Sequence, residues 1–226
     1  MALAAVKYFG NNLEQMNCTQ QFIELLYHND HNSYAFLNMK TANKMKQKAC
    51  LDKCSLIPSD THTDTWVSLN LYASGKSRTA ANVREINGFY FDLDKHDGTS
   101  AQIKRAILKT YNKILELVNK KVLPAPTAIT NTGRGLGLYY IFSRSLAVTE
   151  NTEKQRKLYS YLYSKIADIL QYYMQDKNLL EVDRVVVNDL ARIVRLPGTY
   201  NTAAKTYCTL PVSFYPAYNT VIYLRF

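Results

Sequence analysis

The chain has 226 residues, of which 47% are hydrophobic and 20% are charged, and its formal net charge is +10 with an isoelectric point near 9.3. This is the composition of a folded globular protein and excludes an intrinsically disordered chain. The sequence has no run of about 18 apolar residues and no signal-peptide pattern, so we expect neither a membrane span nor secretion. The basic excess favours a polyanionic partner such as nucleic acid, because each Lys or Arg that meets a phosphate releases counterions.

The chain contains the four cysteines Cys18, Cys50, Cys54 and Cys208. In a chain without a secretion signal, scattered cysteines are typical of reduced thiols, so we expect a cytoplasmic protein. Cys50 and Cys54 are a close pair that could bind zinc with Cys18, His28 or His31, but the spacing is looser than in structural zinc sites. We therefore expect no structural zinc.

In the first third of the chain, hydrophobic periodicity and alternation predict a helix followed by strands. Thr65–Tyr72 alternates well, with Trp66, Ser68 and Asn70 on one side of a strand and Val67, Leu69 and Leu71 on the other. The other expected elements are a helix over Asn12–His28, a strand over Ser33–Met39, a helix or solvated excursion over Thr41–Lys53, and a polar loop over Ala73–Asn82.

The remainder of the chain continues to mix strands with long helices. The expected elements are a strand over Gly88–Leu93, a helix over Ser100–Asn119 with its N-cap at Thr99 or Ser100, strands over Thr127–Thr130 and Leu138–Phe142 around a glycine-rich turn at Gly133–Gly137, a helix over Thr152–Met174, an extended segment over Leu179–Val187, a Pro-Gly turn closing Arg192–Asn201, and two strands over Tyr207–Phe226. Since the hairpin implies antiparallel pairing and regular βαβ units are absent, we expect an α+β fold. The strand-like end suggests a domain cut from a longer protein.

Two carboxylates stand at the end of the predicted apolar strand. In Phe91-Asp92-Leu93-Asp94, residues i and i+2 share a face, which places Asp92 and Asp94 about 6 to 7 Å apart. Such carboxylates repel each other unless a cation lies between them, and Mg²⁺ and Mn²⁺ prefer hard oxygen ligands. The pattern therefore predicts a two-metal site for phosphoryl transfer. The alternative is a solvated strand end whose aspartates cap the next helix.

A two-metal site generally needs a third carboxylate, and the chain offers two candidates. Asp183 precedes the apolar run Val185–Val187, so it stands on another apolar strand. Asp189 lies three residues before Arg192 and fits a turn cap or an ion-pair partner equally well.

Glycine-rich and basic segments follow the carboxylates. Arg134 and Gly135 lie in the turn Thr132–Gly137, where glycines let a backbone approach a phosphate; the alternative is a hairpin loop that needs positive φ. Further on, Arg192 and Arg195 precede Pro197-Gly198 and the polar residues Thr199, Asn201 and Lys205. This arrangement predicts a triphosphate cradle, whereas the alternative is a type II turn with solvated arginines.

The order of these motifs resembles the archaeo-eukaryotic primase superfamily, and more narrowly the primase-like replication proteins of bacterial plasmids and mobile elements. The matching segments are the strand Phe89–Asp94, the strand-turn-strand Asn131–Phe142, and Val182-Asp183 leading to the basic segment Arg192–Lys205. The resemblance covers about Trp66 to Lys205, and Arg-x-x-Arg-Leu-Pro-Gly-Thr-Tyr-Asn is its most specific part.

The resemblance implies an RRM-like antiparallel or mixed catalytic sheet flanked by helices, with an N-terminal α/β extension. Residues 1–64 would then form an N-terminal lobe and residues 65–226 the catalytic core of a single primase-polymerase domain. It implies two Mg²⁺ or Mn²⁺ ions on Asp92, Asp94 and Asp183, the last preferred over Asp189 because its distance to the basic turn fits the superfamily better. The nucleotide-binding set would be Arg134, Gly135, Arg192, Arg195, Asn201 and Lys205.

By the same resemblance, the function is that of a DNA primase or primase-polymerase, a nucleotidyltransferase. Its partners would be single-stranded DNA, nucleoside triphosphates and a helicase or further domain of the same replication protein. One departure stands out: the superfamily's second motif ends in a small residue, any residue and a phosphate-binding His, whereas this chain has Gly135-Leu136-Gly137. Arg134 is a candidate substitute. The absence of the His favours an alternative, a non-catalytic nucleic-acid-binding initiator module on the same fold. A metal-dependent nuclease is a third interpretation.

Overall fold

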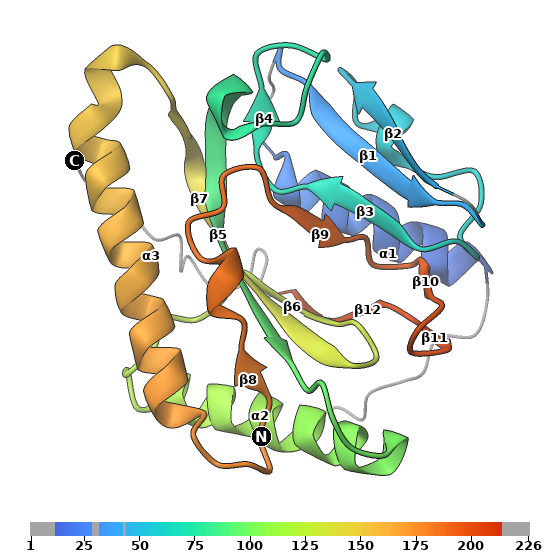
Figure 1. Ribbon diagram of the computed structural model, residues 1–226, viewed down its shortest axis with the longest axis vertical. Helices are drawn as coiled ribbons and strands as arrows, with labels where there is room; N and C mark the ends of the chain where they lie inside the picture. Colours follow the sequence, from blue (N-terminus) through green and yellow to red (C-terminus); the bar gives the residue numbers. More distant parts are fainter. Residues whose placement is uncertain (1–11, 29–31, 43, 214–226) are drawn as a thin grey trace.

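Two larger antiparallel sheets, a third sheet of only two strands and the helices packed on them form the described part of the protein, as seen in the computed structural model, which describes residues 12–28, 32–42 and 44–213 (Figure 1). The helices are α1 (Asn12–Leu26), α2 (Ser100–Asn119) and α3 (Glu153–Tyr173). The strands are β1 (Ala35–Lys40), β2 (Met45–Cys50), β3 (Thr65–Ser68), β4 (Leu71–Tyr72), β5 (Val83–Asp94), β6 (Ala128–Asn131), β7 (Gly135–Ala147), β8 (Glu181–Val182), β9 (Ile193–Arg195), β10 (Tyr200–Asn201), β11 (Thr206–Tyr207) and β12 (Thr209–Ser213).

The large sheet has six strands in the order β12-β6-β7-β5-β4, with β8 pairing with one end of β5. Its longest ladder joins β5 to β7. Because side chains alternate along β5, Phe89, Phe91 and Leu93 enter the main core, whereas Asp92 and Asp94 lie on the opposite face. The strand thus fixes both carboxylates on the face turned away from that core.

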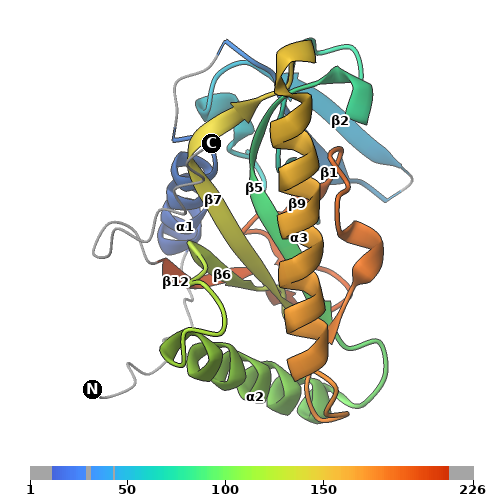
Figure 2. The ribbon, with the colours of Figure 1, turned by 90° about the vertical axis from the view of Figure 1, so that its left-hand side faces the viewer.

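Helices α2 and α3 cover the core face of the large sheet (Figure 2). On α3, Tyr159 and Tyr163 contact Phe89 in the core, with ring centroids 5.0 and 5.1 Å from that of Phe89. Helix α2 begins with a capping box, in which the Gln102 N–H donates to Thr99 Oγ1 at 3.3 Å and the Thr99 N–H donates to Gln102 Oε1 at 2.7 Å. Neither Asp92 nor Asp94 caps this helix, so the capping role that was the alternative for this pair is not observed.

The small sheet has four strands in the order β2-β1-β3-β9. Leu37, Val67 and Val194 share one face of it and pack on α1 in a second core cluster, which also contains Tyr90 and Tyr139 of the large sheet. Helix α1 therefore joins the two sheets. The small sheet also joins β1 and β2 to strands that follow residue 64, so the lobe division at residues 64 and 65 crosses one sheet and stays a prediction.

The α+β fold with an antiparallel sheet and an N-terminal α/β extension is confirmed, and two segments were predicted wrongly. Thr41–Lys53 contains the strand β2, neither a helix nor an excursion. Its side chains are exposed except at the end of the strand, so its polar sequence shows no alternation; pairing with β1 along six residues determines its conformation.

The second of these segments is Leu179–Val187, in which Asp183 does not stand on a strand but caps a short 3-10 helix over Arg184–Val186. In addition, Thr65–Tyr72 divides into β3 and β4, and only Glu181–Val182 of the extended segment forms a strand. Of the two predicted terminal strands, the part beyond residue 213 lies outside the described residues.

Candidate active site

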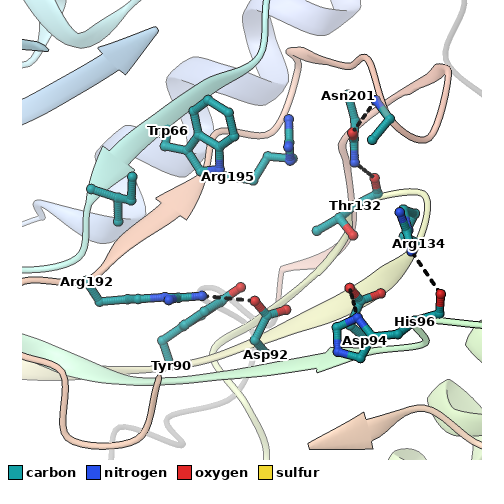
Figure 3. A pocket seen from close by; sticks show the side chains of 12 residues that line it. Trp66, Tyr90, Asp92, Asp94, His96, Thr132, Arg134, Arg192, Arg195 and Asn201 are labelled. Carbon is teal, nitrogen blue, oxygen red and sulfur yellow. Dashed lines mark hydrogen bonds and ion pairs between the residues drawn. The ribbon is translucent and has the colours of Figure 1, made fainter. Parts of the chain in front are cut away.

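A cavity of about 250 Å³ opens between the two larger sheets (Figure 3). The two carboxylates of β5 and the arginines of the basic segment Arg192–Lys205 meet in it. The end of β5 and the β6–β7 turn form one wall, while β3, β9 and the segment after β10 form the other. The predicted site residues that line it are Asp92, Asp94, Arg134, Arg192, Arg195 and Asn201. Asp183, Gly135 and Lys205 are not among its lining residues.

Asp92 and Asp94 lie side by side on the cavity face of β5. Their side chains are 26% and 30% exposed. Burial raises the pKa of Asp92 above its ordinary value, and the neighbouring carboxylates of Asp94 and Asp183 raise it further, although the Arg192 guanidinium opposes them. Asp94 accepts a hydrogen bond from the Lys95 N–H at 2.7 Å, and His96 Nδ1 lies 3.9 Å from its other oxygen. Two carboxylates therefore stand together at this end of the cavity.

Arg192 provides the nearest counter-charge. Its Nη2 donates to Asp92 Oδ2 at 3.1 Å, and its guanidinium carbon lies 5.8 Å from the centroid of the Tyr90 ring. The backbone of Arg192 is fixed as well, since the Leu69 N–H donates to its carbonyl at 2.9 Å. Arg192 is thus an ion-pair partner of the carboxylate and not a solvated side chain.

Arg195 pairs with a different acid. Its Nη1 donates to Asp64 Oδ1 at 2.6 Å, and its guanidinium carbon lies 4.6 Å from the centroid of the Trp66 ring. Although burial disfavours the charged form of Asp64, hydrogen bonds from Thr202 and Arg195 hold its pKa below the ordinary value. The charge of Arg195 is therefore already balanced within the protein.

The Pro-Gly pair forms the type II turn that was the alternative interpretation of this segment. The Thr199 N–H donates to the Leu196 carbonyl at 3.3 Å, and Gly198 has a φ of 85°. The turn is anchored to α1, because the Thr19 hydroxyl donates to the Pro197 carbonyl at 2.7 Å. Arg192 and Arg195, which precede the turn, nevertheless line the cavity. The segment therefore forms a type II turn and also contributes charged side chains to the cavity wall.

Asn201 and Lys205 belong to the β10–β11 hairpin. The amide of Asn201 is engaged in structure: it donates to the Thr132 carbonyl at 2.7 Å and accepts from the N–H groups of Ala203 and Ala204 at 3.2 Å. Lys205 is exposed in the connecting turn, with a φ of 52°. Asn201 thereby joins the hairpin to the β6–β7 turn, and Lys205 extends into solvent beside it.

The β6–β7 turn places Arg134 in the cavity, with Nη2 3.5 Å from the His96 carbonyl oxygen that accepts from it. Gly135 is paired with Asp94 across the ladder. A Cβ at Gly135 would lie 2.1 Å from the Leu93 carbonyl oxygen. The structure therefore gives Gly135 a packing role between β5 and β7.

Asp183 lies beside Asp92, and one of its carboxylate oxygens is engaged in a local turn. The Asp183 N–H donates to the Asp92 carbonyl at 2.9 Å, while its side chain accepts from the Val185 N–H at 2.9 Å. Asp189 caps a turn by accepting from the Ala191 N–H at 2.9 Å. Across residues 12–28, 32–42 and 44–213, no group of three His, Cys, Asp or Glu side chains is close enough to hold a metal ion. The assignment of a third ligand stays a prediction.

Comparisons with known proteins agree with this architecture. No protein-family model matches the chain. A curated relative from Clostridium perfringens, described as "Replication protein", is 27% identical over 147 residues, which are 62% of this chain and 30% of the relative. The fold is similar to the AEP (archaeo-eukaryotic primase) domain of the cyanophage S-2L primase-polymerase, PrimPol, with a TM-score of 0.57 and 12% identity over 87% of this chain and 89% of that one. This chain has the archaeo-eukaryotic primase fold.

Within this primase fold, the donors at the end of β5 fit a divalent cation. Mg²⁺ is commonly held by one or two carboxylates together with substrate phosphates, and Asp92 and Asp94 supply two carboxylates in a cavity that also contains arginines. The pKa of Asp92 is raised first by burial and then by the neighbouring carboxylates, and a bound cation would stabilise the charged carboxylate against both effects. Asp92 and Asp94 are accordingly the candidate ligands.

The position of the missing histidine is also visible in the primase fold. Gly137 pairs with Asp92 in the β5–β7 ladder. A Cβ at this glycine would lie 2.6 Å from Thr130 Oγ1 and 2.9 Å from Tyr90 Cε2. Thr130 and the Tyr90 ring thus occupy the space at residue 137, and a side chain there would require both neighbours to shift.

Sequence reasoning missed six residues that line the cavity: Trp66, Tyr90, His96, Thr132, Ile193 and Ala203. A signal for Trp66 was present, because it shares the polar side of its predicted strand with Ser68 and Asn70. Tyr90 shares the face of Asp92 by the same two-residue period. His96 and Thr132 lie in connections after strands, where no periodicity distinguishes them.

The part of the chain that the structure describes contains no helix that is both long and apolar enough to cross a membrane.

Proposed function

We propose that this chain is the primase or primase-polymerase domain of a replication protein, a nucleotidyltransferase that joins nucleotides on a single-stranded DNA template. The observation that carries this proposal is the cavity itself, in which the carboxylates of Asp92 and Asp94 face arginines from two other segments. The primase fold and the relationship to a replication protein support it. The matched relative extends well beyond the aligned part, since the chain spans about 30% of its length.

Asp92 and Asp94 would hold Mg²⁺ or Mn²⁺, with Asp183 as the proposed third ligand. Bound ions of this kind lower the pKa of an attacking 3′-hydroxyl and stabilise charge on the α-phosphate and the leaving pyrophosphate. The protein's own contribution is binding and orientation: Arg134 and Arg192 can donate several hydrogen bonds to phosphate oxygens. Arg192 pairs with Asp92 through Nη2 alone, and its other N–H groups remain as donors for a phosphate.

The proposed partners are single-stranded DNA and nucleoside triphosphates. A helicase or a further domain of the same replication protein is also proposed, on the basis of the greater length of the matched relative. The net charge of +10 supports a polyanionic ligand, because a basic surface attracts phosphates over distances near the Debye length. A cytoplasmic location and an origin from a plasmid or mobile element remain parts of the same proposal.

A primer-synthesis assay tests the proposal. Labelled dNTPs and NTPs are supplied with Mg²⁺ or Mn²⁺ on a single-stranded template, and wild type is compared with the double variant Asp92→Asn/Asp94→Asn. We expect product to fall by more than about 100-fold, because outer-shell partners of metal ligands alone are worth about 10- to 100-fold. Asp97→Asn is the matched control, since this side chain is 89% exposed near the same strand end and does not line the cavity. Undiminished synthesis by the double variant would contradict the proposal.

Two features favour a second function, a non-catalytic nucleic-acid-binding module of a replication initiator. Gly137 stands where a phosphate-binding histidine was expected, and Asp92 is paired with Arg192. This function predicts single-stranded DNA binding that is unchanged by a metal chelator, together with no product in the synthesis assay. Shortening of the DNA without added nucleotides would instead identify a metal-dependent nuclease.

A further inference from the structure

One aromatic side chain of the cavity has no part in the roles given above. Trp66 is the only tryptophan of the chain. It lies on β3 and lines the cavity together with Asp92 and Asp94. The residue is half-buried, so part of its indole surface is accessible from the cavity. Figure 3 shows the ring on the wall opposite the two carboxylates.

The neighbours of Trp66 hold its ring in place. On the inner strand β3, Trp66 pairs with Asn38 of β1 on one side and Arg195 of β9 on the other. The Arg195 guanidinium carbon lies 4.6 Å from the ring centroid, which is a cation–π contact. Arg195 is itself fixed by Asp64, whose side chain is only 5% exposed. A ring positioned in this way can receive a ligand with little ordering cost.

Two other ring side chains line the cavity, Tyr90 and His96. His96 carries an imidazole, which is smaller and more polar than an indole, and its Nδ1 lies 3.9 Å from Asp94 Oδ2. Tyr90 is only 2% exposed, so its ring is not accessible to a base. Asp94, Arg134 and Arg192 are charged, so they suit metal ions and phosphates. A nucleotide or single strand also carries a base, and aromatic side chains bind bases by stacking whatever their identity.

We propose that Trp66 is a nucleobase platform: its indole face stacks on an unpaired base of a nucleotide or single strand whose phosphates meet the Asp92–Asp94 end of the cavity. The inference deepens the proposed function and rests on it for the class of ligand. The base belongs either to an incoming triphosphate or to the template strand, and both present the same chemistry to the ring.

Fluorescence tests the platform directly, because tryptophan emission comes from this one residue. The protein is titrated with dATP and Mg²⁺, with inorganic tripolyphosphate and Mg²⁺, and with a short thymidine oligonucleotide. We expect saturable quenching by at least one base-carrying ligand and little change with tripolyphosphate, which has phosphates but no base. Quenching by dATP assigns the base of the incoming nucleotide, and quenching by the oligonucleotide alone assigns the template. Equal quenching by tripolyphosphate, or none by any ligand, would overturn the inference.

Variants separate stacking from a structural effect. Calorimetric binding of the base-carrying ligand should weaken about tenfold or more in Trp66→Ala and by less than about threefold in Trp66→Phe, which retains a ring. Binding of tripolyphosphate should be the same in both variants as in wild type. Tyr161→Ala is the matched control, since Tyr161 is 58% exposed on α3, outside the cavity. An equal loss of tripolyphosphate binding in Trp66→Ala would show that the ring only supports the fold, against the proposal.

Failure of this inference is distinguishable from failure of the proposed function. If synthesis depends on Asp92 and Asp94 while Trp66→Ala binds nucleotides and DNA as wild type does, the primase function stands and the platform is wrong. If no synthesis is found but base-dependent quenching persists, the platform stands on a non-catalytic module.

Discussion

Asp64 and Asp92 each pair with an arginine at the cavity, but their surroundings shift the two pKa values in opposite directions. Hydrogen bonds from Thr202 and Arg195 lower the pKa of Asp64 against the effect of burial. Burial and nearby carboxylates raise the pKa of Asp92 against the effect of Arg192. The charged form of Asp64 therefore stabilises the folded protein, whereas the charged form of Asp92 opposes folding.

We predict that Asp64→Asn lowers the free energy of unfolding by about 3 kcal/mol at neutral pH, because it leaves Arg195 without its buried partner. A carboxyl group with a lowered folded-state pKa contributes stability that is present above its unfolded pKa and lost as the pH falls through the folded pKa. The difference between wild type and variant should therefore shrink below about pH 4. Urea unfolding of wild type and variant, at neutral pH and below about pH 4, measures this difference. A difference that is constant with pH would contradict this account.

Asp92→Asn is the counterpart of that variant. A carboxyl group with a raised folded-state pKa contributes stability that is fully present below its unfolded pKa and lost as the pH rises through the folded pKa. At neutral pH the substitution should therefore leave the free energy of unfolding unchanged or raise it by up to about 1 kcal/mol, as removal of a strained functional group often does. Destabilisation equal to that of Asp64→Asn would show that the ion pair with Arg192 dominates.

The residue types of the cavity could be predicted from the sequence, but their pairing could not. Asp92, Arg192 and Arg195 were each expected at the site. The pairs that form, however, join residues 100 positions apart for Asp92 with Arg192 and 131 positions apart for Asp64 with Arg195. No local pattern encodes such a choice, because it depends on which strands become neighbours in the two sheets.

At the scale of elements, agreement with the sequence follows the strength of the local signal. Helix α2 has the bounds expected for it, because apolar periodicity and the cap at Thr99 both specify it. Strand β2 was missed, because exposed lysines carry no alternation and only pairing with β1 makes the segment extended. The same dependence on neighbours explains why the turn between β6 and β7 is shorter than the predicted turn Gly133–Gly137. Gly135 and Gly137 lie within β7, where they are paired with β5.

Strand β7 yields a prediction at Gly137. We expect Gly137→Ala to lower the free energy of unfolding by about 2 kcal/mol, since the added Cβ would meet Thr130 Oγ1 and the Tyr90 ring at distances too short for packed atoms. Urea unfolding measures the effect. In the double variant Thr130→Ala/Gly137→Ala the loss should be smaller than the sum of the single losses, because one clashing atom is gone. Additive losses, or no loss in Gly137→Ala, would contradict the packing account.

At the scale of the molecule, the cavity exists only because two sheets meet beside α1. Its walls come from β3, from the end of β5, from the β6–β7 turn and from β9 with the hairpin that follows. These segments span more than half of the sequence, so the sequence could supply the parts but not their assembly. Within the cavity Arg192 and Arg195 are each paired with an acid, whereas Lys205 in the hairpin turn beside the cavity is exposed to solvent.

This distribution makes the salt dependence of DNA binding informative. The affinity for single-stranded DNA should fall as salt rises, and the slope of log K against log salt has a magnitude of about 0.7 for each phosphate that the protein neutralises. Lys205 is exposed in the turn that also carries the cavity residue Ala203, so Lys205→Gln should reduce the magnitude of the slope by about 0.7. Lys120→Gln makes the same charge change at the end of α2, where the side chain is 63% exposed and paired with Glu116, and should leave the slope unchanged. Fluorescence anisotropy across a salt series gives both slopes. Equal slopes for the two variants would mean that DNA responds only to net charge and not to the surface beside the cavity.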